Sequence, residues 1–370
     1  MIGIDRRLIN NFNWLLFVVA LLLTSIGIAT IYSANYNPEG VSYLSFIHVK
    51  KQLIWLIVSF FSMIIFISFD YKKLEAYVFP LYIFNVILLI AVLIIGKTSM
   101  GAQRWLSLGG FNFQPSELFK FTTILIVAKF FSNESKIKEY SLIEVLKLIL
   151  MILFPVALIV KQPDLGTGLL ILFVFSSMLL FVGIKRSSLI KIIAAGLIFA
   201  PLSWNFLKTY QKKRILTFLF PEKDPLGAGY HIIQSKIAVG SGKLFGKGYL
   251  HGTQNKLHFL PEEHTDFIFS VFAEEWGFIG TLILISIYIV FFITMINISQ
   301  KARDNFGALI VIGVLFIFFW QFFINIGMVI GILPVVGIPL PLISYGGTSL
   351  VVSYSLIGLV LNVGMRRYIF

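Results

Sequence analysis

The sequence predicts an all-α, polytopic membrane protein with about ten transmembrane helices. Hydrophobic residues make up 58% of the 370 residues, charged residues make up only 13%, and the mean hydropathy is +0.91. Soluble globular proteins are about 45–50% apolar and about 25% charged. The apolar residues also gather into runs of the length that crosses a bilayer, which is about 20 residues. Both observations indicate a chain embedded in lipid.

The first apolar run, 13–32, follows Arg6 and Arg7. It is too long for the apolar core of a typical signal peptide and lacks a convincing cleavage site, so we interpret it as a helix. Each later run is bounded by charged residues or by Gly and Pro. The predicted spans are 13–32, 51–69, 77–96, 116–132, 143–161, 166–183, 189–206, 267–298, 307–332 and 346–364.

The distribution of Lys and Arg predicts the orientation, because short cytoplasmic segments carry the excess of basic residues. With the N-terminus inside, thirteen basic residues fall in cytoplasmic segments and five in short outer ones, namely Lys50, Lys51, Lys97, Arg104 and Lys161. Both termini are then cytoplasmic, as an even number of spans requires. We therefore expect one integral domain, 1–370, in the cytoplasmic (inner) membrane, with its active face extracytoplasmic.

The net charge of +13 is compatible with several partners. Here the basic residues lie at the ends of apolar runs, which favours anionic lipid head groups over nucleic acid. There is no cysteine, so disulfides and thiolate metal sites are excluded.

The predicted long extracytoplasmic loop, 207–266, contains its own helical segments. Basic residues at 210–214 precede apolar residues at 215–220, a pattern typical of a segment in the head-group plane. A short amphipathic helix is expected at 230–239. The glycines that follow predict a flexible stretch. Ser241–Gly248 departs from the phosphate-loop pattern, so a mobile loop is the simpler interpretation, although its amides and Lys243 or Lys247 could meet a phosphate.

The densest polar cluster is 258–266, directly before a long apolar run. One interpretation is that Thr265 or Asp266 caps the helix. The other makes Asp266 a general base at the membrane surface. A metal site formed by Glu262, His264 and Asp266 is a third alternative, but it matches no zinc spacing.

Charged residues at the edges of other spans are candidate binding residues. Glu117 and Lys120 are three apart, hence on one helix face, and form either a structural ion pair or part of a cavity. Asp164 lies in a polar break that is either a tight turn or a cavity rim. Arg104 and Trp105 lie in a Gly-rich outer loop, where Trp is a membrane anchor or holds a sugar ring. The Pro- and Gly-rich segment 331–347 predicts irregular backbone that is buried or lines a cavity.

Several of these segments together resemble one family. The segments 327–349, 261–269, 161–168 and 101–105, together with Gln114–Glu117, resemble in matching order the motifs of the shape, elongation, division and sporulation (SEDS) family. Residues 332–337 resemble the elongation branch of that family more than the division branch.

The resemblance implies a peptidoglycan glycosyltransferase of ten helices that polymerises lipid II into β-1,4-linked glycan strands and releases undecaprenyl pyrophosphate. Asp266 matches the family's essential aspartate, Glu117 and Lys120 its cavity ion pair, and Arg104 and Trp105 a sensitive outer loop. It implies as partners a class B penicillin-binding protein, the nascent glycan and other membrane proteins of the elongation machinery.

The expected reaction makes Asp266 the base that deprotonates the acceptor hydroxyl, with inversion at the donor carbon. The ionised leaving group needs cationic stabilisation, for which Arg104, Lys120 and Arg214 are candidates. A divalent cation is compatible with this chemistry, although no ligand set is evident. Two other functions remain open: a lipid II flippase, and a noncatalytic scaffold of the cell-wall machinery.

Overall fold

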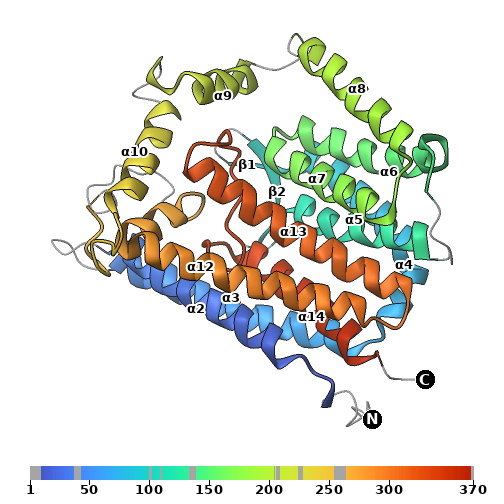
Figure 1. Ribbon diagram of the computed structural model, residues 1–370, viewed down its shortest axis with the longest axis horizontal. Coiled ribbons are helices and arrows are strands. Elements are labelled where there is room, and N and C mark those ends of the chain that lie inside the picture. Colours follow the sequence, from blue (N-terminus) through green and yellow to red (C-terminus); the bar gives the residue numbers. More distant parts are fainter. Residues whose placement is uncertain are drawn as a thin grey trace.

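The computed structural model describes residues 10–36, 43–99, 102–108, 111–132, 139–203, 205, 209–223, 228–253 and 264–367. In this part of the chain, a helix overlaps each of the ten predicted spans (Figure 1). These helices are α2 (Trp14–Ala34), α3 (Tyr43–Ser68), α4 (Leu74–Ile95), α5 (Pro115–Ser132), α6 (Leu142–Lys161), α7 (Leu165–Val182), α8 (Arg186–Ser203), α12 (Ile268–Gln300), α13 (Asn305–Val329) and α14 (Gly347–Met365). The chain is thus an all-α polytopic membrane protein.

Eight helices among the described residues are long and apolar enough to cross a membrane; α5 and α8 are not among them. Helix α5 carries Glu117, Lys120 and Lys129, yet it is almost wholly buried among α4, α7, α13 and α14. A charged residue in a membrane helix is tolerated when it faces the protein interior. Because other helices surround α5, its low hydropathy is compatible with a place inside the bundle.

One predicted boundary is wrong by a wide margin. Helix α3 begins at Tyr43, eight residues before the expected start at 51, so Lys50 and Lys51 lie inside a helix and not in a loop. An apolar run marks only the part of a helix that crosses hydrocarbon, whereas backbone hydrogen bonding continues beyond it. The two lysines end the apolar run without ending the helix.

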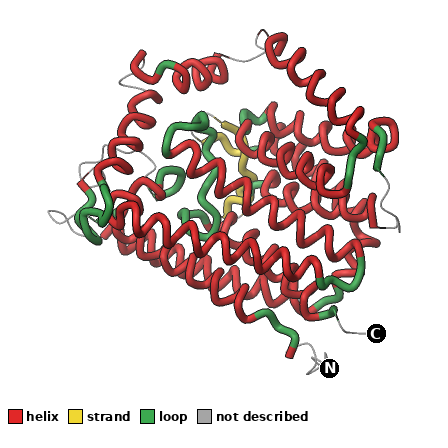
Figure 2. Tube along the Cα trace, in the orientation of Figure 1, coloured by secondary structure: helices red, strands yellow, loops and turns green. Residues whose placement is uncertain are grey.

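The segment 97–113 forms a small antiparallel sheet where we expected a loop. Strand β2 (Ala102–Leu108) lies between β1 (Lys97–Ser99) and β3 (Phe111–Phe113). In register, Lys97 pairs with Trp105, and Leu106 pairs with Phe113. Figure 2 shows these strands in yellow near the centre of the view. Two of the three strands have only three residues, too few for a two-residue period to be visible in the sequence.

The two ends of the bundle can be distinguished by their contacts. A polar cavity at one end is lined by 10–13, before α2, by Lys301, after α12, and by Gly364 and Arg367, at the end of α14. At the other end, the Ser33 hydroxyl of α2 donates to Glu275 of α12, so these helices are antiparallel. The start of α2 and the end of α14 share one end of the bundle, which we call the terminal end. The start of α12 therefore lies at the opposite end.

A half-buried aspartate, Asp304, ties the helices together at the terminal end of the bundle. Asp304 accepts hydrogen bonds from the Gly307 amide at 2.8 Å and from the Tyr71 hydroxyl at 2.7 Å, and its carboxylate lies 3.1 Å from Lys72 Nζ. Burial alone raises the pKa of Asp304, but the amide, hydroxyl and ammonium partners outweigh it and hold the pKa below its usual value. The ionised carboxylate thus links the start of α13 to the short helix η1 (Tyr71–Lys73).

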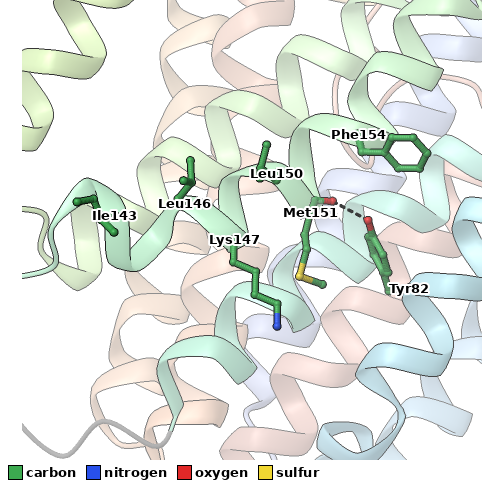
Figure 3. A pocket seen from close by; sticks show the side chains of 7 residues that line it. All are labelled: Tyr82, Ile143, Leu146, Lys147, Leu150, Met151 and Phe154. Carbon is green, nitrogen blue, oxygen red and sulfur yellow. Dashed lines mark hydrogen bonds between the residues drawn. The ribbon is translucent and has the colours of Figure 1, made fainter.

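Proline determines how α4 packs on α6. Pro155 lies within α6 and has no amide hydrogen, so the Met151 carbonyl one turn earlier loses its helical donor. The Tyr82 hydroxyl of α4 donates to that carbonyl at 3.1 Å, as the dashed line in Figure 3 shows. In hydrocarbon every backbone polar group must find a partner within the protein. The hydrogen bond from Tyr82 to Met151 therefore joins α4 to α6 at the turn that Pro155 leaves without a backbone donor.

Three helical elements follow α8 in an arc at the top left of Figure 1. They are α9 (Thr209–Leu219), η3 (Pro221–Lys223) and α10 (Ala228–Ser241), and α10 confirms the short helix expected at 230–239. Helix α10 packs on α12, where the Ser235 and Ser270 hydroxyls lie 2.8 Å apart. Ser235 also donates to the Val329 carbonyl at 2.7 Å. The arc is thus joined to the bundle at its α10 end.

Candidate functional site

The backbone around Asp266 is held by three hydrogen bonds from two other parts of the chain, helix α13 and the segment before α14. The Asn325 amide of α13 donates to the Asp266 carbonyl at 2.9 Å. The Ser344 hydroxyl donates to the Thr265 carbonyl at 2.7 Å, and the Tyr345 amide donates to the His264 carbonyl at 2.9 Å. Three successive carbonyls are therefore fixed, which defines where the Asp266 side chain begins.

The carboxylate of Asp266 faces a glycine. A Cβ atom at Gly337 would lie 3.3 Å from Asp266 Oδ2, and Gly337 has φ +75. That φ is strained for any residue with a side chain. The glycine therefore lets the backbone of the irregular segment pass close to the carboxylate, while the Asp266 residue remains partly exposed.

Of the two interpretations of the polar cluster, helix capping loses its geometric basis. Helix α12 begins at Ile268, and the residue in the capping position is Phe267. Neither Thr265 nor Asp266 occupies the position from which a side chain usually caps the first turn. Glu262, the third member of the alternative metal set, lies outside the described residues. In the described part of the chain, no three His, Asp or Glu side chains form a group suited to a metal.

A second polar cluster forms around Asp164, at the turn between α6 and α7. Its Oδ1 accepts the Thr167 amide at 3.3 Å, so Asp164 caps α7. Its Oδ2 accepts the Gln114 side-chain amide at 3.1 Å. Arg104 Nη1 lies 3.8 Å from Asp164 Oδ1, and Nη2 donates to the Pro163 carbonyl. The turn and the strand that carries Arg104 are thereby joined.

The irregular segment 331–346 connects the two clusters. A Cβ atom at Gly166, two residues after Asp164, would lie only 2.4 Å from the Val336 carbonyl oxygen. Val336 directly precedes Gly337, which faces the Asp266 carboxylate. Two successive residues of one segment therefore touch the start of α7 and the candidate base. The predicted irregular backbone is the element that sets the distance between them.

Glu117 and Lys120 form the ion pair that their spacing predicts. Lys120 Nζ lies 2.8 Å from Glu117 Oε2, and both residues are buried. The hydroxyl of Ser116, the neighbour of Glu117, lies 3.5 Å from Asp164 Oδ2. A buried pair is costly to break because one charge is then left without a partner. The pair lies one residue from the Asp164 cluster and keeps the start of α5 fixed beside it.

Three predicted binding residues lie apart from these contacts. Trp105 pairs with Lys97 in the sheet and points to the face opposite that of its neighbour Arg104. Arg214 is on α9, in the arc of Figure 1, and α9 packs on α10 and η3. The Lys243 carbonyl accepts the Phe278 amide at 2.9 Å, and Phe278 lies ten residues, or about 15 Å of helix, after the start of α12 near Asp266. The structure thus gathers Arg104 and Asp164, and does not gather Arg214 or Lys243 with them.

A cluster of rings includes His264, two residues before Asp266. The rings of His48 and His264 are 4.8 Å apart, and those of His264 and Tyr345 are 5.6 Å apart. Burial raises the pKa of the Tyr345 hydroxyl above its usual value, so this phenol stays neutral at physiological pH. Two imidazoles therefore lie near the candidate base: His264 is two residues before it in the chain, and the His48 ring contacts that of His264.

The chain is similar to known proteins along almost its whole length. Residues 13–369 match the family model that covers FtsW, RodA and SpoVE, described as cell cycle protein. This chain belongs to the SEDS family. The peptidoglycan glycosyltransferase MrdB of Escherichia coli strain K12 is 42% identical over 354 residues, which cover 95% of this chain and 93% of that protein. The peptidoglycan glycosyltransferase RodA of Treponema pallidum is 32% identical and covers 98% of this chain and 99% of its own.

Solved structures of SEDS proteins have the same fold. One belongs to a peptidoglycan synthase complex that coordinates polymerization and crosslinking; it superimposes with a TM-score of 0.82 at 29% identity, over 97% of this chain and 99% of that one. The crystal structure of the Thermus thermophilus rod shape determining protein RodA gives a TM-score of 0.71 at 26% identity, over 96% and 98%.

Sequence reasoning missed the residues that hold this SEDS site in place. Asn325 lies in an apolar run and donates both to Asp266 and to the Ile338 carbonyl, at 2.8 Å. Ser344 accepts the Leu340 amide at 2.8 Å. A polar residue in the middle of a membrane span is a signal that could have identified Asn325. Nothing in the sequence distinguishes Ser344 from other small polar residues.

Proposed function

We propose that this chain polymerises lipid II at the site formed by Asp266, the segment 331–346 and the Asp164–Arg104 cluster. The chain is a peptidoglycan glycosyltransferase, like the relatives that match it along almost their whole length. The observation that supports the assignment of the base is the placement of Asp266. The backbone carbonyls of residues 264–266 are fixed by three hydrogen bonds, and the residue is partly exposed with its carboxylate against a glycine.

In the proposed reaction the Asp266 carboxylate takes the proton of the 4-hydroxyl on the acceptor GlcNAc. The hydroxyl oxygen attacks the anomeric carbon of the donor MurNAc. The bond from that carbon to the pyrophosphate oxygen breaks, and undecaprenyl pyrophosphate leaves with the electron pair. Attack from the opposite face inverts the centre and gives a β-1,4 bond. A positioned base supplies about 10²–10⁴-fold of rate.

Arg104 is the residue that we propose to face the leaving pyrophosphate. Its side chain is partly exposed, and the weak 3.8 Å contact with Asp164 leaves guanidinium donors for an anion. Lys120, in contrast, is buried and pairs with Glu117 at 2.8 Å. Its charge stabilises the site through that pair. Trp105, on the other face of the strand, would pack on a sugar ring.

The orientation supports a reaction on the extracytoplasmic side of the cytoplasmic membrane. Asp266 lies at one end of the bundle, and the start of α2 and the end of α14 lie at the other. The excess of Lys and Arg in the segments at the terminal end supports a cytoplasmic position for it. We propose that 207–266 is a long extracytoplasmic loop of a single integral domain, with α9 lying in the head-group plane. Lipid-linked substrates then reach the site from the outer leaflet.

The partner that we propose is a class B penicillin-binding protein. The solved peptidoglycan synthase complex that coordinates polymerization and crosslinking contains a chain of this fold. Crosslinking requires a transpeptidase close to the growing strand, which supports a stable pair. Other membrane proteins of the elongation machinery would join through surfaces that do not involve this site.

The test is to supply purified chain and partner with lipid II in detergent and to resolve the products on a gel. We expect glycan strands, because glycosyl transfer needs no bilayer. A flippase needs two leaflets and would give no polymer in detergent. A noncatalytic scaffold would also leave lipid II unchanged, and it would support cell shape when Asp266 is replaced by Asn.

A further inference from the structure

Residues 242–253, here named the bracket loop, lie across a break in α12. At Gly277 the helix has φ 63 and ψ −162, so its hydrogen-bond ladder is interrupted. The bracket loop supplies the missing partners: the Lys247 amide donates to the Glu274 carbonyl at 3.0 Å, and the Phe278 amide donates to the Lys243 carbonyl at 2.9 Å. The flexible stretch expected from the glycines is therefore a fixed element.

Two buried carboxylates hold the bracket loop to α12. Glu274 has no exposed surface; its Oε1 accepts Lys247 Nζ at 2.6 Å and the Thr253 amide at 2.8 Å. Glu275, also buried, accepts the Leu250 amide at 3.2 Å and the Ser33 hydroxyl of α2. Because removing either carboxylate would leave buried donors without a partner, the loop and both helices form one rigid unit.

The tip of the bracket loop is apolar and uncovered. Leu244 is 59% exposed and Phe245 is 79% exposed. The Ile279 amide donates to the Leu244 carbonyl at 3.1 Å, which places the tip beside the membrane half of α12. Phe278, Ile279 and Ile283 there are also exposed, on a helix that crosses the membrane. The tip thus continues a surface that faces lipid.

The length of α12 gives the depth of the tip. The apolar residues 278–298 rise about 30 Å as a helix, which is about the thickness of the hydrocarbon core. Lys301 follows at the terminal end, so Phe278 lies close to the opposite boundary of the core. Tyr249 supports this level: its hydroxyl donates to the Ala29 carbonyl at 3.1 Å, about 7 Å inside the end of α2. Tyr is enriched at this boundary.

We propose that Leu244 and Phe245 insert into the lipid leaflet at the Asp266 end of the bundle and anchor the bracket loop there. The two side chains enter the boundary between head groups and acyl chains, while Lys243 remains at the level of the lipid phosphates. Since the bracket loop is fixed to the first half of α12, the anchor holds the residues that follow Asp266 at a constant depth. A site that takes lipid-linked sugars gains from a constant depth, and this last step rests on the proposed function.

The chain has no cysteine, so a single one can carry a nitroxide without background. Phe245→Cys, Ile283→Cys and Arg303→Cys are labelled in the full chain and placed in liposomes of phosphatidylethanolamine and phosphatidylglycerol. Collisions with oxygen, which enters acyl chains, are compared with collisions with a water-soluble nickel chelate. Ile283 is the lipid reference on α12, and Arg303 is the exposed reference outside the spans.

We expect the oxygen-to-nickel ratio at position 245 to be several-fold above that at 303 and at or below that at 283. A ratio equal to that at 303 would place the tip in water and overturn the proposal. Suppressed collisions with both reagents would mean that protein covers the tip, which also overturns it. The measurement involves no glycosyl transfer, so its failure is distinct from failure of the proposed function.

Discussion

Gly166→Ala tests the link between the two polar clusters. The added Cβ would lie 2.4 Å from the Val336 carbonyl oxygen, whereas ordinary contacts of this kind begin at about 3.4 Å. The segment 331–346 must therefore move by about 1 Å, and Gly337 with it, away from its position against Asp266. A misplacement of about 1 Å can cost about 10²-fold in rate. Overpacking of this size costs about 1–3 kcal/mol of stability.

Gly168→Ala is the matched control on the same helix. There a Cβ would meet only the tips of the Val160 and Val156 side chains, at 3.2 Å and 3.8 Å, and these can turn aside. Both variants gain the same helix propensity, about 1 kcal/mol. The assay is the initial rate of lipid II polymerisation by each purified variant with the partner. Full activity of Gly166→Ala, or equal losses in both variants, would refute the proposed link.

Three other experiments test the packing. Tyr82→Phe leaves the Met151 carbonyl without a donor and should cost about 1–3 kcal/mol, and Pro155→Ala in the same chain should restore the melting temperature by supplying an amide; no rescue would contradict the assignment. Lys247→Met leaves its carboxylate partner charged and buried and should cost about 3–5 kcal/mol; an unchanged melting temperature would argue against a structural pair. Asp304→Asn should destabilise by about 1–2 kcal/mol at pH 7. Because the pKa of Asp304 is lowered on folding, the difference from wild type should shrink only below about pH 4, and a constant difference at lower pH would be inconsistent with the ionised clamp.

The sequence was most informative where chemistry is local. Apolar runs located ten helices, eight of which are long and apolar enough to cross a membrane, and the spacing of Glu117 and Lys120 predicted their ion pair. Asp266 was a candidate because it ends the densest polar cluster, directly before a long apolar run, and because it matches the essential aspartate that the family resemblance implies.

Long-range contacts explain what the sequence could not indicate. The bond between Lys247 and Glu274 joins residues 27 apart, and a glycine-rich segment that fails one motif gives no hint of such a contact. The passage of Val336 and Gly337 between Gly166 and Asp266 depends on how three separate segments pack. Strands of three residues carry no readable period. Each failure concerns a partner distant in the chain or an element too short to show a pattern.

The most direct measurement is the length of glycan strands made from lipid II by Asp266→Asn and by wild type, each with the partner, on one gel. The amide keeps the shape and the backbone contacts of the side chain but cannot take a proton. We expect an Asp266→Asn protein that folds and purifies with its partner yet forms no polymer above background. Strands of normal length and yield from this variant would show that Asp266 is not the base.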